Sequence, residues 1–186
     1  MSESMSEGAA SRKYVDPRAH ALRNRYLAAF GGTGIPAPVE AIAEDLLGLR
    51  IEERWDMGDC SGLLLPGERL IVLNAAERTS GRNDPPLRRF RFTVAHEIGH
   101  WICHAQEGAN PEPVYCRQVD LARDADRSLE REANVFAAEL LMPEQIVREA
   151  WTATPDLEAC AARFDVSPTA MQWRLYSFGL VEGGPQ

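Results

Sequence analysis

The stretch FTVAHEIGHWICH, residues 92–104, contains the pattern His-Glu-x-x-His, formed by His96, Glu97 and His100. Residues four apart lie above one another on a helix, so the two imidazoles can bind one cation. Glu97 lies between them, placed to accept a proton from a water molecule that the cation activates. By chance, a chain of this composition contains roughly 0.01 such matches. We therefore expect a helix over residues 87–105 that carries a metal site, with Glu97 as general base.

His104 continues the same row of this helix, but we do not expect it to bind the same ion. It lies eight residues, or about 12 Å along the helix axis, from His96, whereas zinc holds its nitrogen ligands at about 2.0–2.1 Å. The third histidine of the metzincin pattern would stand at position 106, which is Gln106, so that family is excluded. Because a catalytic zinc site takes three protein ligands, a carboxylate must supply the third.

The stretch LEREANVFAAELLMP, residues 129–143, predicts a second helix from about 128 to 142 with an apolar stripe on one face. Its acidic residues are Glu130, Glu132 and Glu139. Glu130 is at the edge of that stripe, one turn before Ala133, which is small enough to allow two helices to approach closely. Asn134 follows on the same face as Glu130 and suits a group that orients a metal-bound imidazole. We therefore favour Glu130 as the third ligand, with Glu132 as the main alternative.

Outside these two helices the periodicity changes. Helices are predicted over residues 17–30 and 39–48, and strands over 49–55, 62–65 and 70–73. The prediction is an α+β fold, in which a small, mainly antiparallel three-stranded sheet packs with helices around a zincin-like catalytic core. We expect the strand Leu70–Asn74 at the sheet edge, where an extended peptide could pair with it beside the metal. A polar loop is expected over 107–126, and short helices after 143.

The predicted organisation has four parts. Residues 1–14 are rich in Ser, Glu, Gly and Ala and are expected to form a disordered tail. Residues 15–143 hold the metallopeptidase core, residues 144–182 a helical segment similar to a helix-turn-helix, and residues 183–186 a short tail. Over residues 156–186 the basic residues are Arg163 and Arg174. Because DNA readout needs several basic or amide groups on one helix, we do not expect direct nucleic-acid binding.

Composition and charge narrow the class of protein further. The 186 residues carry a formal net charge of -8, which argues against a surface that coats nucleic acid or anionic lipid. Four cysteines occur without a CxxC pair, a pattern that does not indicate a disulfide framework. No apolar run reaches the ~18 residues of a membrane span, and the first residues lack the apolar segment of a secretory signal. We expect a cytoplasmic protein with no membrane association, and the sequence leaves its oligomeric state open.

The two helices together resemble the ImmA/IrrE family of metallopeptidases, which control phage repressors and stress regulons in bacteria. The likeness covers residues 36–143 and rests on RFTVAHEIGHWICH and LEREANVFAAELLMP. It implies a gluzincin-like site in which His96, His100 and a glutamate of the second helix bind one zinc ion and Glu97 is the general base. Gluzincins often carry Glu-x-x-x-Asp on that helix. In this chain the residue four positions after Glu130 is Asn134 instead of aspartate. The asparagine side chain can still form hydrogen bonds.

The resemblance also implies a substrate, a helix-turn-helix repressor whose cleavage at one site releases the genes that it silences. Two imidazoles and one carboxylate favour Zn²⁺, and Mn²⁺ or Fe²⁺ stay open. Two other classes stay open as well: a DNA-binding transcription regulator and an antitoxin-like binding protein, with a structural metal site. Tyr115 is a weak candidate for stabilising the oxyanion. We do not assign it to the site, because a loop tyrosine more often packs.

Overall fold

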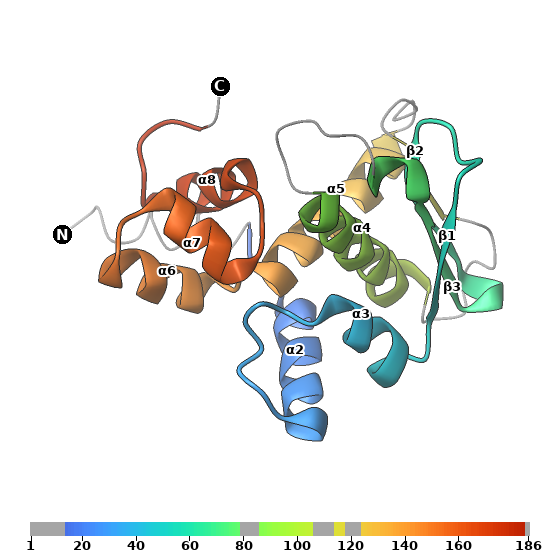
Figure 1. The fold of residues 1–186 in the computed structure, drawn as a ribbon, viewed down its shortest axis with the longest axis horizontal. Coiled ribbons are helices and arrows are strands. Elements are labelled where there is room, and N and C mark those ends of the chain that lie inside the picture. The colour runs from blue at the N-terminus through green and yellow to red at the C-terminus, as the bar shows by residue number, and fades with distance from the viewer. Residues whose placement is uncertain (1–13, 79–85, 106–113, 118–123, 185–186) are drawn as a thin grey trace.

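The computed structural model describes residues 14–78, 86–105, 114–117 and 124–184 (Figure 1). Of the two predicted tails, residues 1–13 and 185–186 lie outside the described residues. None of the helices within the described ranges combines the length and the apolar character that crossing a membrane requires.

The N-terminal helices form where they are predicted. α2 (Pro17–Phe30) begins after Asp16, whose carboxylate accepts a hydrogen bond from the backbone N–H of Arg18 at 2.8 Å, and it ends at Gly31, where φ is 76°. The second predicted helix is composed of α3 (Val39–Ala41) and a π-helical segment, η1 (Ile42–Leu46). Val39 and Ile42 are fully buried, so this short helix contributes directly to the core.

The sheet has four strands, β1 (Arg50–Arg54), β2 (Cys60–Leu65), β3 (Leu70–Asn74) and β4 (Val114–Arg117), in the order β1-β3-β2-β4. The three predicted strands are confirmed. β2 pairs antiparallel with both β3 and β4, whereas β1 pairs parallel with β3, so the sheet is mixed. A 3₁₀ turn, η2 (Pro66–Glu68), joins β2 to β3, and a second one, η3 (Ala75–Arg78), follows β3.

Two predictions about the sheet are wrong. The segment expected to be a polar loop contains the fourth strand, β4, which pairs with β2. The strand Leu70–Asn74 is not an edge strand: β1 and β2 flank it, and all five of its residues are buried. The physical reason is its composition, since LIVLN is apolar on both faces and a strand of this kind is stable only when it is covered on all sides.

α4 (Pro86–His100) lies at the centre of the molecule, between the sheet and α5 (Asp124–Leu141) (Figure 1). A π-helical segment, η4 (Trp101–Ala105), continues it. Val94 and Ile98 of α4 and Phe136 and Leu140 of α5 are fully buried in the common core. The two long helices predicted from the sequence are thus confirmed, and they pack directly on each other.

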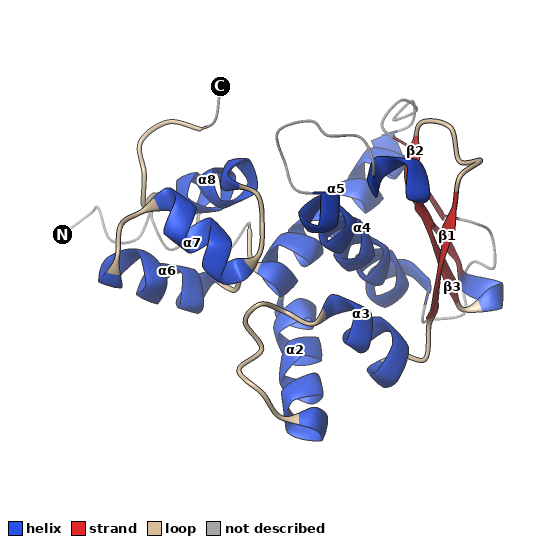
Figure 2. Cartoon of the chain, viewed as in Figure 1, coloured by secondary structure: helices blue, strands red, loops and turns tan. Residues whose placement is uncertain are grey.

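Three helices follow α5 and form a separate group beside it: α6 (Glu144–Ala153), α7 (Leu157–Phe164) and α8 (Pro168–Ser177) (Figure 2). Asp156 caps α7 by accepting a hydrogen bond from Ala159 N at 2.9 Å, and Ser167 caps α8 in the same way. Phe164, Met171 and Leu175 are fully buried between these helices and join the core of the chain.

Candidate metal centre

His96 and His100 lie one turn apart on α4 and turn their rings toward each other. Their Nε2 atoms are 3.0 Å apart, and both side chains are buried. Burial lowers the pKa of His100, because the low-polarity interior disfavours the charged imidazolium. A neutral imidazole keeps a lone pair on one ring nitrogen, which is the form that binds metals.

Glu130 of α5 completes a triangle with the two histidines. Its Oε2 lies 3.2 Å from His96 Nε2 and its Oε1 lies 3.2 Å from His100 Nε2. Burial alone would raise the pKa of Glu130, but its interactions with the rings of His100 and His96 outweigh this effect and lower the pKa to about 2. The carboxylate is therefore ionised at neutral pH.

These three side chains fit a zinc ion. Ligands held at about 2.0–2.1 Å in a tetrahedron lie about 3.3–3.4 Å from one another, close to the spacing observed between the donor atoms. One carboxylate and two neutral imidazoles are also the donor set of many catalytic zinc sites, which leave the fourth position open.

The close crossing of α4 and α5 brings the donor atoms together. A Cβ atom on Gly99 would lie 3.0 Å from both Cα and O of Ala133, so any larger residue would require one of the two backbones to shift. Ala133 is fully buried at the crossing, and Glu130 is one turn before it. The small residues at this crossing thus set the distance between the glutamate and the two histidines.

Asn134 controls the orientation of the His96 ring. His96 Nδ1 lies 3.1 Å from Asn134 Oδ1. An amide oxygen can only accept, so His96 donates through Nδ1 and keeps the lone pair of Nε2 available for a metal. His100 has no comparable support: its buried Nδ1 lacks a hydrogen-bond partner among the described residues.

Glu97 is buried with 0% exposure, and neither of its carboxylate oxygens has a hydrogen-bond partner among the described residues. Burial raises the pKa of Glu97 to about 8, against the attraction of the His96 ring. Two unsatisfied buried acceptors are costly for a folded protein. Because such groups are typical of positions that a ligand or a reaction uses, Glu97 is a candidate functional residue.

Gly62 of β2 makes room for Glu97. A Cβ atom at this position would lie 2.8 Å from Glu97 Oε1 and 2.5 Å from Cγ2 of Thr93. The strand therefore passes directly over the side chain of Glu97. Sequence reasoning did not identify Gly62. The available signal was a glycine inside a predicted strand, which often marks the close approach of another group.

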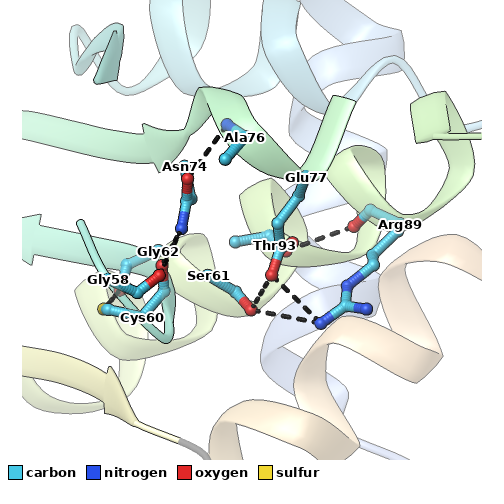
Figure 3. A network of polar contacts seen from close by, with 9 residues as sticks. All are labelled: Gly58, Cys60, Ser61, Gly62, Asn74, Ala76, Glu77, Arg89 and Thr93. Carbon is cyan, nitrogen blue, oxygen red and sulfur yellow. Dashed lines mark hydrogen bonds and ion pairs between the residues drawn. The ribbon is translucent and has the colours of Figure 1, made fainter. Parts of the chain in front are cut away.

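Polar contacts hold β2 against the start of α4 (Figure 3). The Arg89 guanidinium donates to Glu77 Oε1 at 3.0 Å and to Ser61 Oγ, and the Ser61 hydroxyl donates to the same Glu77 oxygen at 2.6 Å. The Asn74 amide donates to Cys60 O at 2.9 Å. This network joins β2, β3 and α4 around the strand segment that covers Glu97.

Cys103, His104 and Glu132 form a second cluster, and their potential ligand atoms lie within 4.8 Å of one another. It is a poorer cation site for two reasons. Arg18 already pairs with Glu132 at 3.4 Å, which places a fixed positive charge beside the cluster. Burial raises the pKa of the Cys103 thiol to about 12, so it is protonated at neutral pH, whereas metals bind the thiolate.

The third glutamate of α5, Glu139, does not contribute to the triangle. Glu139 forms a buried ion pair with Arg174 of α8. Tyr115 is part of β4, opposite Leu63, so a strand carries it rather than the loop that the sequence predicted. Of the three glutamates offered by α5, only Glu130 therefore stands within 3.2 Å of both histidines.

Comparison with known proteins gives one family and one fold. A model of the Peptidase_M78 family, described as the IrrE N-terminal-like domain, matches residues 63–176. Among solved structures, a Mycobacterium tuberculosis transcriptional regulator is similar in fold, with a TM-score of 0.58 and 16% sequence identity. The alignment covers 88% of this chain and 48% of that one, so this chain spans about half the length of the regulator. No curated protein matches the chain in sequence.

Proposed function

Because this chain belongs to the Peptidase_M78 family of IrrE N-terminal-like domains, we propose that it is a zinc-dependent endopeptidase. The observation that carries the proposal is the triangle of donor atoms from His96, His100 and Glu130, separated by 3.0–3.2 Å. The buried and unsatisfied carboxylate of Glu97 stands on the same helix. A metallopeptidase of this kind needs both a set of metal ligands and a carboxylate that can act as base.

In this proposal His96, His100 and Glu130 hold the ion. A zinc ion bound there acts as a Lewis acid, which lowers the pKa of a water molecule and polarises the scissile carbonyl. Glu97 is the general base: it accepts the proton of the attacking water and passes it to the departing amine. Asn134 keeps the His96 ring oriented.

The proposed substrate is a helix-turn-helix repressor in the cytoplasm, because the resemblance to ImmA/IrrE peptidases implies a protein of this class. An extended segment of such a substrate could pair with β4. Among the described strands, β4 lies at the sheet edge beside β2, the strand that covers Glu97. This replaces the interior strand β3 as the place for strand addition.

The test uses the zinc-loaded protein, its Glu97→Gln variant, and the helix-turn-helix repressor encoded nearest to its gene. We expect Glu97→Gln to keep one zinc ion per chain and to cleave the repressor about 10²–10⁴-fold more slowly. Glu132→Gln, an equal change on the exposed face of α5, is the control and should cleave normally. Equal cleavage by the wild type and Glu97→Gln would exclude Glu97 as the general base. Cleavage that persists after complete removal of zinc would exclude a zinc-dependent reaction.

A further inference from the structure

A groove of about 720 Å³ leads away from the metal centre, between α5 and α8. At one end it is lined by Glu130 and Asn134, and farther along α5 by Ala138. These residues follow one another at intervals of four, so they form a single row on the helix. The row spans eight residues, or about 12 Å. This is the length of three to four residues of an extended peptide, at about 3.3 Å each.

Aromatic side chains form the opposite wall. Trp173 and Tyr176 of α8 line the groove with 53% and 47% of their surfaces exposed, and their rings are in edge contact at 6.0 Å. Tyr14 adds a third exposed aromatic residue. Tryptophan and tyrosine contribute a large share of the binding energy at protein interfaces, because they bury much apolar area at little entropic cost.

The end of the groove near the metal centre is basic. Arg127 and Arg131 line it beside Glu130, which is the one acidic residue among the described residues of the lining. Arg131 is exposed, and no ion pair or hydrogen bond joins it to another described residue. A guanidinium at the rim of an apolar groove favours a partner that places a carboxylate there.

The groove is held open by a buried contact. The Arg174 guanidinium, on α8, forms an ion pair with Glu139 of α5 and donates hydrogen bonds to Met142 O at 2.9 Å and to Tyr14 O at 2.7 Å. Arg174 also stacks on Phe178 with 4.4 Å between its guanidinium carbon and the ring centroid. Because these contacts fix α8 relative to α5, a ligand does not have to order the groove when it binds.

We propose that this α5–α8 groove is the specificity site of the peptidase. It binds a short substrate segment that carries a bulky apolar side chain, which packs between Ala138 and Trp173, and an acidic residue that pairs with Arg131. This inference rests on the proposed peptidase function, since Glu130, one of the three residues that would hold the metal, lines one end of the groove. The segment beside the scissile bond would thereby select which bond reaches Glu97.

The test is selection of a phage-displayed library of random peptides on the full-length Glu97→Gln protein, followed by affinity measurement with fluorescent copies of the enriched peptides. We expect the enriched peptides to share a large apolar residue with an acidic residue a few positions away. Trp173→Ala should weaken their binding about tenfold. Ala138→Arg should abolish binding by filling the groove, and Arg131→Glu should weaken the peptides in proportion to their acidic residues.

Arg25→Glu, the same charge change on an exposed position of α2, is the matched control and should bind normally. Thermal melts of each variant separate lost binding from lost folding, and Trp173→Ala removes a side chain that is 53% exposed. No enrichment, or enriched peptides that bind all variants equally, would overturn the proposal. A dimer that Trp173→Ala dissociates would assign the groove to a second copy of the chain and also overturn it.

A cleavage assay distinguishes peptide binding in the α5–α8 groove from peptidase activity at the metal centre. The enriched peptides are offered to the zinc-loaded wild type, and cleavage is read by mass spectrometry. Peptides that depend on the groove for binding but are never cleaved would support the groove and contradict the peptidase function. Cleavage that is unaffected by Trp173→Ala and Ala138→Arg would support the peptidase function and contradict the groove.

Discussion

Glu130 and Glu132 are two residues apart on α5, yet their surroundings differ completely. The Glu130 carboxylate faces both histidines, whereas Glu132 lies on the far side of the helix and pairs with Arg18. A rotation of about 200° separates two such positions on a helix. At the residue scale, the choice of metal ligand is therefore a question of which side of α5 faces α4.

Glu130→Ala should lose its zinc, and Glu132→Ala should keep it. Replacing residues that merely orient zinc ligands weakens metal binding by about 10–100-fold, so removal of a ligand should cost more than that. The measurement is zinc content after dialysis, together with a competition titration against a chelator of known affinity. Retention of zinc by Glu130→Ala would contradict the assignment, most directly if Glu132→Ala lost it.

Gly62→Ala should reduce both stability and peptidase activity, because the new Cβ atom would lie 2.5 Å from Thr93 Cγ2 and 2.8 Å from Glu97 Oε1. Overpacking of this kind typically costs about 1–3 kcal/mol. The free energy of unfolding is measured in urea. Gly67→Ala, with no atom within 4 Å of its Cβ, is the control. Adding Thr93→Ser, which removes the nearer contact, should recover part of the loss; if it recovers nothing, the steric explanation is wrong.

At the scale of elements, the site is a property of the α4–α5 crossing. α4 supplies two donors and the proposed general base, and α5 supplies the third donor and Asn134. Gly99 against Ala133 sets how close the helices come. β2 then closes the site from the sheet side through Gly62. Each element places its own side chains through local geometry, and the contacts between elements decide whether those side chains meet.

Gly99→Val should separate the two helices and weaken zinc binding without touching a ligand. The valine would meet the Ala133 backbone, which cannot move out of the way as a side chain can. We expect a loss of about 2–3 kcal/mol in the free energy of unfolding and a lower zinc affinity. Ala28→Val, on an exposed position of α2, controls for a valine in a helix. Unchanged zinc affinity in Gly99→Val would show that the crossing does not set the geometry of the site.

At the scale of the whole molecule, the buried ion pair of Glu139 with Arg174 joins the C-terminal helices to α5. Both side chains are 3% exposed. The pair connects elements that share the apolar core but lie on different sides of the groove. The contribution of this pair to the free energy of unfolding depends on both partners, because a buried charge that lacks its partner destabilises the folded state.

Arg174→Met should destabilise the protein by about 3–5 kcal/mol, since it leaves the Glu139 carboxylate buried and unpaired. This is a large part of the total stability of a typical domain. The double variant Glu139→Leu with Arg174→Met should be more stable than the single one, because it removes both charges and keeps apolar volume. Urea denaturation of the three proteins checks this. A double variant no more stable than Arg174→Met would contradict the account.

Much of this architecture follows from local patterns. The i, i+4 spacing of His96 and His100 predicts their shared face, and the same spacing predicts that Glu130 and Asn134 share one on α5. The positions of the helices and of β1, β2 and β3 follow from periodicity, capping residues and glycine or proline breaks. These features depend on neighbours within a few residues, so they can be read along the chain.

The remaining features depend on contacts between distant segments. From the sequence alone, either Glu130 or Glu132 could be the third ligand, β3 was placed at the sheet edge, and β4 was not predicted. Strand order and the sides on which two helices face each other are set by packing over the whole chain. Gly62 is over Glu97 only because β2 crosses α4 at that point. The residue types therefore determine which chemistry the site can support. Its geometry is determined by the tertiary contacts that bring α4, α5 and β2 within a few ångströms of one another.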